Sequence, residues 1–132
     1  MATIFTRIVA GEIPCYRIAE NEQYLAFLDI NPLQEGHTLV IPKTEVNFIF
    51  DMEEELHAGL WTFARRVGKA IGQVVPCKRV GITVIGLEVP HAHIHLIPIN
   101  TLYDMDFRKP KLSFTQEEFL QIAAKIANAM DK

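Results

Sequence analysis

The 132-residue sequence has few cysteines, no long apolar run and no surplus of basic residues. Cys15 and Cys77 are its two cysteines, and they lie too far apart to indicate a disulfide framework or a four-cysteine zinc site, which favours a reducing cytoplasm. No stretch approaches the roughly 18 apolar residues of a membrane-spanning helix, and the N-terminus lacks the pattern of a secretion signal. The net charge of −3 comes without a basic stripe, which argues against a nucleic-acid-binding groove. We therefore expect a cytoplasmic protein that binds neither membranes nor nucleic acids.

Hydrophobic residues make up 49% of the sequence and charged residues 22%, which is the balance of an ordinary globular protein. At this length we expect one domain over residues 1–132, large enough to bury a core. Five short segments with alternating or continuous apolar residues are predicted to be strands, at residues 15–19, 23–29, 36–43, 78–85 and 91–99. Together with a long helix and a C-terminal helix, these strands predict an α+β fold.

Three helices are predicted from their capping residues. Thr3 can cap a short helix near the N-terminus. Asp51 with Glu54, and Thr115 with Glu118, form the sequence pattern of a capping box, which predicts the starts of the long helix and of the last one. Apolar residues at spacings of three and four predict the inner sides of these two helices. They are Leu56, Leu60, Phe63, Val67, Ile71 and Val74 in the long helix, and Phe119, Ile122, Ile126 and Met130 in the last.

Three of the five histidines, His91, His93 and His95, occupy alternate positions in the last third of the sequence. Alternation at a period of two predicts a strand, with the three imidazoles on one of its faces. Such imidazoles could be satisfied structural side chains, metal ligands, or nucleophiles and acid–base groups. The spacing alone leaves these alternatives open.

Residues 91–97 (HAHIHLI) resemble the signature of the histidine triad family, in which three alternating histidines precede two apolar residues. Two other segments resemble that family in the expected order, residues 27–30 (FLDI) and 36–43 (GHTLVIPK). The opening residues 4–14 also look like the family's N-terminus, so the likeness covers about residues 3–98. This resemblance implies a five-stranded antiparallel sheet and a homodimer in which the two sheets are continuous.

The resemblance also implies a reaction and a role for each histidine. His93 would attack the α-phosphorus of a purine nucleoside phosphoramidate or a related phosphoanhydride, and water would hydrolyse the resulting nucleotidyl-histidine. His91 would orient His93 through its backbone carbonyl, His95 would contact the phosphate and help the leaving group depart, and His37 would support the arrangement. A neutral imidazole has a free lone pair, so this chemistry requires no metal and no cofactor.

The nucleotide would be held by residues from several segments of the chain. By resemblance, Asp29 would accept hydrogen bonds from the ribose hydroxyls, which a carboxylate can do for both, and Ile30 would touch the base. Taken alone, however, Asp29 is a common type of turn residue, and Gly86 could simply turn the chain. The predicted nucleotide-binding residues are Ile4, Phe5, Ile8, Phe27, Asp29, Ile30, Gly86, Glu88 and Val89.

The sequence departs from the family at four positions. Leu87 stands where many members carry glutamine, and Val80 where many carry asparagine, so two polar groups that would touch phosphate or ribose are missing. Thr3 and Thr6 occupy the positions of the Cys-x-x-Cys pair of zinc-carrying members, so we expect no structural zinc. The changes at Leu87 and Val80 bear on the substrate class and the rate more than on the nucleophile.

Two other functions remain open from the sequence. One is a zinc-dependent hydrolase that uses His91, His93 and His95 as ligands, because three imidazoles often hold catalytic zinc. The other is a nucleotide-binding module without turnover, which Val80 and Leu87 would suit.

Overall fold

The computed structural model describes residues 2–131, which contain one five-stranded sheet. Its strands are β1 (Arg17–Glu20), β2 (Tyr24–Leu28), β3 (Thr38–Pro42), β4 (Arg79–Thr83) and β5 (Ile94–Ile99). They lie in the order β1-β2-β3-β5-β4, and every neighbouring pair is antiparallel. The helices are α1 (Ile4–Val9), α2 (Glu54–Val74) and α3 (Gln116–Asn128), with short 3₁₀ helices at Ile49–Asp51 and Leu102–Met105. The predicted α+β class and the antiparallel sheet are confirmed.

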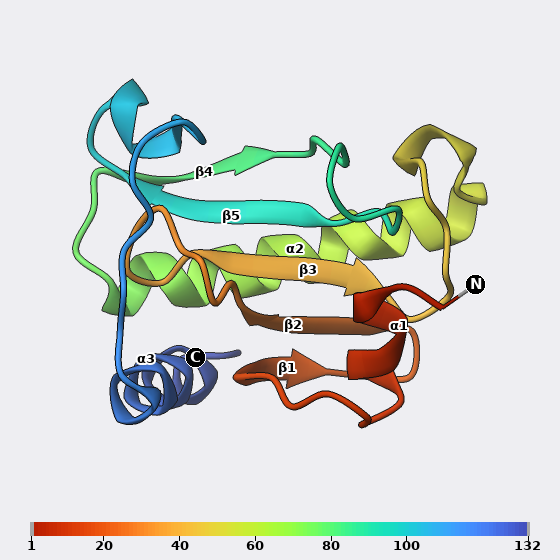
Figure 1. The fold of residues 1–132 in the computed structure, drawn as a ribbon, viewed down its shortest axis with the longest axis horizontal. Coiled ribbons are helices and arrows are strands. Elements are labelled where there is room, and N and C mark those ends of the chain that lie inside the picture. The colour runs from red at the N-terminus through yellow and green to blue at the C-terminus, as the bar shows by residue number, and fades with distance from the viewer. Residues whose placement is uncertain (1, 132) are drawn as a thin grey trace.

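The long helix α2 and the short helix α1 lie on opposite faces of the sheet (Figure 1). Successive side chains of a strand point to opposite faces, so Ala26 and Val40 belong to the core beneath α2, whereas Phe27 and Leu39 pack with α1. This is why every residue of β2 and β3 is buried, as the continuous apolar run in the third segment predicts.

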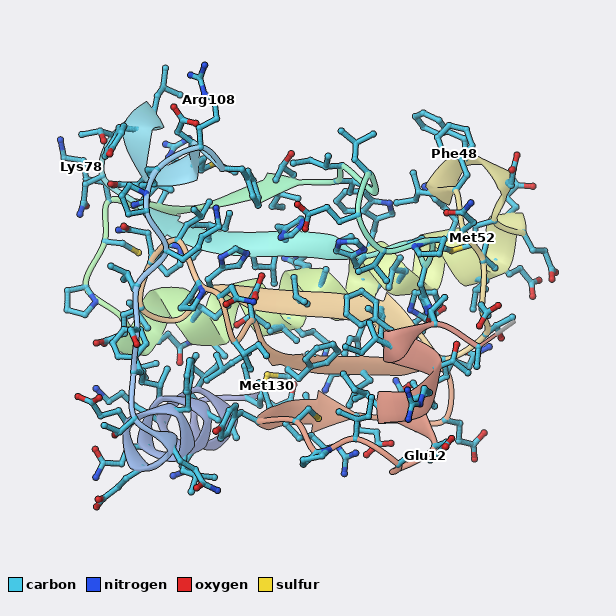
Figure 2. The ribbon with its side chains drawn as sticks, in the orientation of Figure 1. Glu12, Phe48, Met52, Lys78, Arg108 and Met130 are labelled. Atoms are coloured by element: carbon cyan, nitrogen blue, oxygen red, sulfur yellow. The ribbon has the colours of Figure 1, made fainter. Side chains whose placement is uncertain are left out.

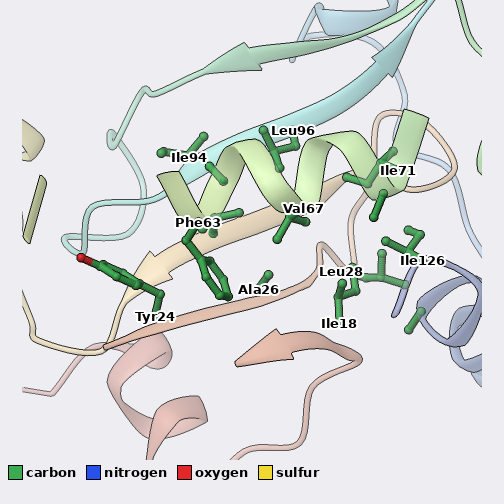
Figure 3. Packing of buried hydrophobic residues seen from close by; sticks show 14 of the residues in the cluster. Ile18, Tyr24, Ala26, Leu28, Phe63, Val67, Ile71, Ile94, Leu96 and Ile126 are labelled. Carbon is green, nitrogen blue, oxygen red and sulfur yellow. The ribbon is translucent and has the colours of Figure 1, made fainter. Parts of the chain in front are cut away.

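Packing of α2 against the sheet forms the larger core. Figure 3 shows Phe63, Val67 and Ile71 of this helix directed at the strands, and all three are buried, as their spacing predicts. Burial of each such side chain contributes roughly 1.5–3 kcal/mol. Leu56 and Val74, at the ends of the predicted stripe, are only partly buried.

The two capping-box predictions have different outcomes. The Thr115–Glu118 capping box at α3 is confirmed, since Thr115 N donates to Glu118 Oε1 at 2.8 Å and Glu118 N donates to Thr115 Oγ1 at 3.1 Å. The Asp51–Glu54 box is wrong, because Asp51 ends a 3₁₀ helix and the backbone of Met52 is extended. Helix α2 therefore begins only at Glu54, after an N-cap residue that makes no side-chain cap hydrogen bond.

The predicted strand at residues 91–99 begins later than its alternating pattern indicates, at Ile94. Pairing of β5 with β3 starts at Ile94, opposite Val40. Just before it, Ala92 N donates to Val46 O, in the segment that follows β3. His91 and His93 therefore precede the strand, because the chain there is bonded to a loop instead of the neighbouring strand.

After β5 the chain forms a segment over residues 106–112, called the crossing segment below, that passes one end of the sheet on its way to α3 (Figure 1). Two contacts fix it to the loop between β2 and β3. Leu112 N donates to Pro32 O at 2.8 Å, and Lys109 Nζ donates to Gln34 Oε1 at 2.6 Å. Among residues 2–131, no helix is long and apolar enough to cross a membrane.

Candidate active site

A cavity of about 500 Å³ lies on the α1 face of the sheet, which is large enough for one small ligand. It is bordered by α1, the end of β2, the loop before the alternating histidines, and the crossing segment. Eleven of the predicted site residues line it: Ile4, Phe5, Ile8, Phe27, Asp29, Ile30, Gly86, Glu88, Val89, His93 and His95. His91 and His37 do not line the cavity and lie behind it, each bonded to a neighbouring element.

The His93 ring is held in one orientation from two sides. Its Nδ1 lies 2.7 Å from the backbone oxygen of His91. Because a carbonyl oxygen can only accept, Nδ1 carries the proton of the neutral ring, and Nε2 keeps its lone pair. The Phe5 ring packs edge-on against the imidazole, with 5.0 Å between the centroids.

His91 is fully buried, and both of its ring nitrogens are used. Nε2 lies 2.9 Å from Pro42 O and therefore donates to it, which leaves Nδ1 to accept from the Thr3 hydroxyl at 3.0 Å. Burial lowers the pKa of His91 and so favours its neutral form. This residue holds the backbone carbonyl that His93 uses, and its ring is enclosed between β3 and α1.

His37 and His95 form a second bonded pair. The backbone amide of Leu33 donates to His37 Nδ1 at 3.0 Å, so the His37 proton is on Nε2, which donates to His95 Nδ1 at 3.0 Å. The neutral His95 ring then carries its own proton on Nε2, and His95 lines the cavity. Burial lowers the pKa of both His37 and His95 to about 3, so both rings are neutral at pH 7.

Asp29 follows β2 and serves two purposes. Its Oδ1 accepts from Asn31 N at 2.8 Å, which is the turn interaction expected of an aspartate at this place. The side chain also lines the cavity, and burial raises the pKa of its carboxyl group. Its Oδ2 lies 3.6 Å from His37 Nε2, a contact with a neutral ring and not an ion pair. Ile30, next in sequence, is 62% exposed at the edge of the cavity.

One part of the cavity is apolar. Phe5 and Phe27 meet edge to face at 5.6 Å between centroids, and Ile8 and Leu39 belong to the same buried cluster. Flat rings and branched side chains of this kind offer surfaces on which a nucleobase can stack. Leu39 was not predicted at the site, although its alternation with Val40 places it on this face.

Gly86 has a φ of +76°, in the left-handed region that glycine adopts without strain. A Cβ atom at this position would meet nothing within 4 Å. Gly86 therefore turns the chain, which is the simpler of the two roles considered for it from the sequence. The loop that follows it borders the cavity. Leu87, in place of the family's glutamine, is 89% exposed on the cavity edge.

Several cavity residues were missed by the sequence analysis. They are Ile13, Pro14, Cys15, Leu28, Asn31, Leu39, Ile85, Phe107 and Lys111. Phe107 and Lys111 lie outside every strand, helix and motif that the sequence predicts. Only the fold of the crossing segment, fixed by long-range hydrogen bonds, brings them to the histidines.

The histidines and carboxylates near the cavity do not fit a zinc ion. Histidine, cysteine, aspartate and glutamate side chains are the ones that could bind a metal ion. Among residues 2–131, only Asp29, His37 and His95 form a group of three whose ligand atoms all lie within 4.8 Å of one another. Its His37 Nε2 carries a proton as long as Leu33 N donates to the other ring nitrogen, so it has no lone pair for a metal. His91, His93 and His95 do not form such a group, which argues against the three-histidine zinc site.

The two positions at which zinc-carrying members of the family have a Cys-x-x-Cys pair do not fit zinc in this chain either. Thr3 and Thr6 offer neutral hydroxyl groups in place of thiolates. The Thr6 hydroxyl donates to Glu45, and the Thr3 hydroxyl bonds His91. Hydrogen bonds therefore occupy the groups that would otherwise be available as ligands.

Comparisons with known proteins agree with the fold and with the histidine pattern. A family model described as "HIT domain" matches residues 10–102. An adenosine 5'-monophosphoramidase of Schizosaccharomyces pombe is 34% identical over 130 residues, which cover 97% of this chain and 98% of that protein. A HIT-like protein from Bartonella henselae, described as involved in cell-cycle regulation, superposes with a TM-score of 0.85 at 26% identity, covering 97% and 96% of the two chains. A zinc-bound histidine triad family protein from Mycobacterium smegmatis gives 0.80 at 28% identity, covering 98% and 93%. The chain therefore belongs to the histidine triad, or HIT, family.

Proposed function

We propose that this protein is a nucleotide hydrolase that cleaves a purine nucleoside phosphoramidate or a related phosphoanhydride through a nucleotidyl-histidine on His93. The observation that carries the proposal is the bond of His93 Nδ1 to the His91 carbonyl, which leaves an unprotonated Nε2 on a cavity-lining ring. The names of two yeast relatives, both adenosine 5'-monophosphoramidases and 34% and 36% identical to this chain, support the substrate class.

In the first step His93 Nε2 forms a bond to the α-phosphorus, and the bond from phosphorus to the leaving nitrogen or oxygen breaks. The leaving group keeps the electron pair of that bond, and a leaving nitrogen also takes up one proton from solvent. His95 Nε2–H donates a hydrogen bond to a phosphate oxygen, and the backbone amides of Gly86, Glu88 and Val89 are available for the developing negative charge. Pro90 has no amide hydrogen to add.

In the second step water attacks the phosphorus and releases His93 together with the nucleoside monophosphate. Water loses one proton to solvent as its oxygen bonds to phosphorus. Asp29 holds the ribose hydroxyls throughout, and the apolar cluster around Phe5 and Phe27 receives the base. No step of this route uses a metal ion, so turnover should persist in EDTA.

The decisive experiment is mass spectrometry of protein quenched during turnover of adenosine phosphoramidate. An adduct of one adenylyl group should map to His93, and His93→Ala should lose both the adduct and turnover while still binding adenosine monophosphate. His57→Ala is the matched control, because His57 lies on α2 and bonds Trp61, away from the cavity. An adduct on another residue, or normal turnover by His93→Ala, would end the nucleophile assignment. Nucleotide binding without turnover of any phosphoramidate or phosphoanhydride would favour the binding module.

We also propose that the chain forms a homodimer through the free edge of β4. This strand pairs with β5 alone in the described part of the chain, so its other edge has unpaired backbone groups. An apolar groove between α2 and β4 adjoins this edge and includes Trp61, Val80 and Ile82, the last of which is 52% exposed. Light scattering should give twice the 15.0 kDa chain mass, and a monomer at micromolar concentration would contradict the proposal.

A further inference from the structure

The crossing segment places two side chains at the cavity that the proposed reaction does not yet use, Phe107 and Lys111. Its position is fixed by the hydrogen bond from Leu112 N to Pro32 O and by the bond from Lys109 Nζ to Gln34. Both anchors lie on the loop between β2 and β3, which follows Asp29. The segment is thus attached beside the residues proposed to hold the ribose.

Phe107 covers the bonded histidine pair. Its ring meets the His95 ring edge-on at 4.9 Å between centroids and the His37 ring at 6.1 Å. This aromatic cover contributes to the burial that keeps both imidazoles neutral. At pH 7 neither ring is therefore an imidazolium, which is the form that readily gives a proton to a departing group.

Lys111 is the one lysine or arginine among the described residues that line the cavity. Its ammonium group donates to the backbone oxygen of Phe107 at 2.6 Å, and no carboxylate among residues 2–131 lies within 4.0 Å of it. The positive charge contributes to lowering the pKa of His37 and opposes the burial that raises the pKa of Asp29, so it acts on the polar part of the cavity. Lys109, by contrast, is nearly buried and is bonded to Gln34.

We propose that Lys111 binds the negative charge of the leaving group, so that the favoured substrates are nucleoside phosphoanhydrides, in which a phosphate departs rather than an amine. This inference rests on the proposed function of the same cavity. It assigns Lys111 a role in specificity, since the ammonium group contacts the departing part of the substrate and not the attacking nitrogen.

A phosphate and an amine differ in the charge with which they leave, and Lys111 can act only on a charged leaving group. When His93 Nε2 bonds to the α-phosphorus of an anhydride, the bridging oxygen leaves with the electron pair as part of a phosphate anion and needs no proton. Lys111 stays protonated and neutralises the charge that develops on that oxygen. An amine leaving group must instead take up a proton from solvent and departs as a neutral molecule, so it carries no negative charge for the ammonium group to neutralise. The neutral His37–His95 pair and the unpaired Lys111 charge therefore both favour the anhydride.

The test compares two substrates that react at the same adenylyl phosphorus, diadenosine triphosphate with an anionic leaving group and adenosine phosphoramidate with an amine. In the Lys111→Ala variant kcat/KM should fall about fivefold for the first, as one solvent-exposed charge pair allows, and stay within about twofold for the second. Lys111→Arg should keep most of the rate. Arg108→Ala is the matched loss of positive charge, because this side chain points away from the molecule (Figure 2), is 91% exposed and pairs with Asp106. It should change neither rate.

Equal losses on both substrates in Lys111→Ala would overturn the proposal and would indicate contact with the adenylyl group itself. No loss on either substrate, or the same loss in Arg108→Ala, would overturn it too. If the wild-type protein turns over neither substrate, the proposed function fails, and calorimetry still tests Lys111. Adenosine diphosphate should then bind Lys111→Ala about fivefold more weakly than it binds the wild type, while adenosine monophosphate binds both alike. Equal affinities of the two proteins for the diphosphate would reject the role.

Discussion

Replacement of Thr3 by valine should destabilise the protein by about 2–4 kcal/mol, because one hydroxyl group serves two partners. Thr3 Oγ1 accepts from Thr6 N at 3.0 Å as the N-cap of α1 and bonds His91 Nδ1 at 3.0 Å. Loss of an N-cap side chain costs about 1 kcal/mol. A buried ring nitrogen left without a donor costs a further 1–3 kcal/mol, approximately. Valine has nearly the same shape, so no cavity adds to this sum.

The free energy of unfolding should be measured in urea at one protein concentration, since association would otherwise shift the result. Thr3→Ser keeps the hydroxyl and should lose less than about 1 kcal/mol. Thr44→Val removes an exposed hydroxyl that makes no side-chain hydrogen bond among residues 2–131, and it should stay within about 0.5 kcal/mol of the wild type. If Thr3→Val costs no more than Thr44→Val, the bond to His91 does not stabilise the fold.

Two further predictions concern the buried histidines. Burial lowers the pKa of His37 and His95 to about 3 in the folded protein, so the unfolded chain binds more protons below pH 6.5. Stability should therefore be complete above pH 6.5 and fall on acidification, by roughly 2 kcal/mol for each histidine at pH 5, and equal urea midpoints at pH 7 and pH 5 would contradict this. Phe107→Ala should admit water to His95 and raise its pKa above about 3. An NMR titration of the imidazole carbons measures that pKa, and an unchanged value would show that Phe107 is not its cover.

The sequence predicts most elements of the fold because their signals are local. The Thr115–Glu118 box and the apolar spacing of α2 are properties of neighbouring residues, and both hold in the structure. The Asp51–Glu54 box has the same pattern, yet Ile49 and Met52 are buried and hold the chain in a 3₁₀ turn. Tertiary packing therefore overrides the local capping pattern here, and a capping rule based on neighbouring residues does not include tertiary packing.

The site was harder to predict wherever it depends on distant contacts. Alternation correctly indicates that His93 and His95 are close, with 4.8 Å between their ring centroids. It does not indicate that His91 precedes the strand and turns its ring toward Thr3. Phe107 follows β5 in a segment without periodicity, and it reaches His95 only because of hydrogen bonds to the loop after β2.

The protonation of the site follows from two backbone groups that no residue pattern reveals. The His91 carbonyl can only accept, so it keeps the His93 proton on Nδ1 and the lone pair on Nε2. The Leu33 amide can only donate, so it keeps the His37 proton on Nε2 and thereby directs the His95 proton to the other nitrogen. The neutral His93 ring thus presents a lone pair to the cavity, and the neutral His95 ring presents an N–H group. A pocket arranged in this way would suit a substrate with a good leaving group, such as the phosphate that we propose Lys111 binds.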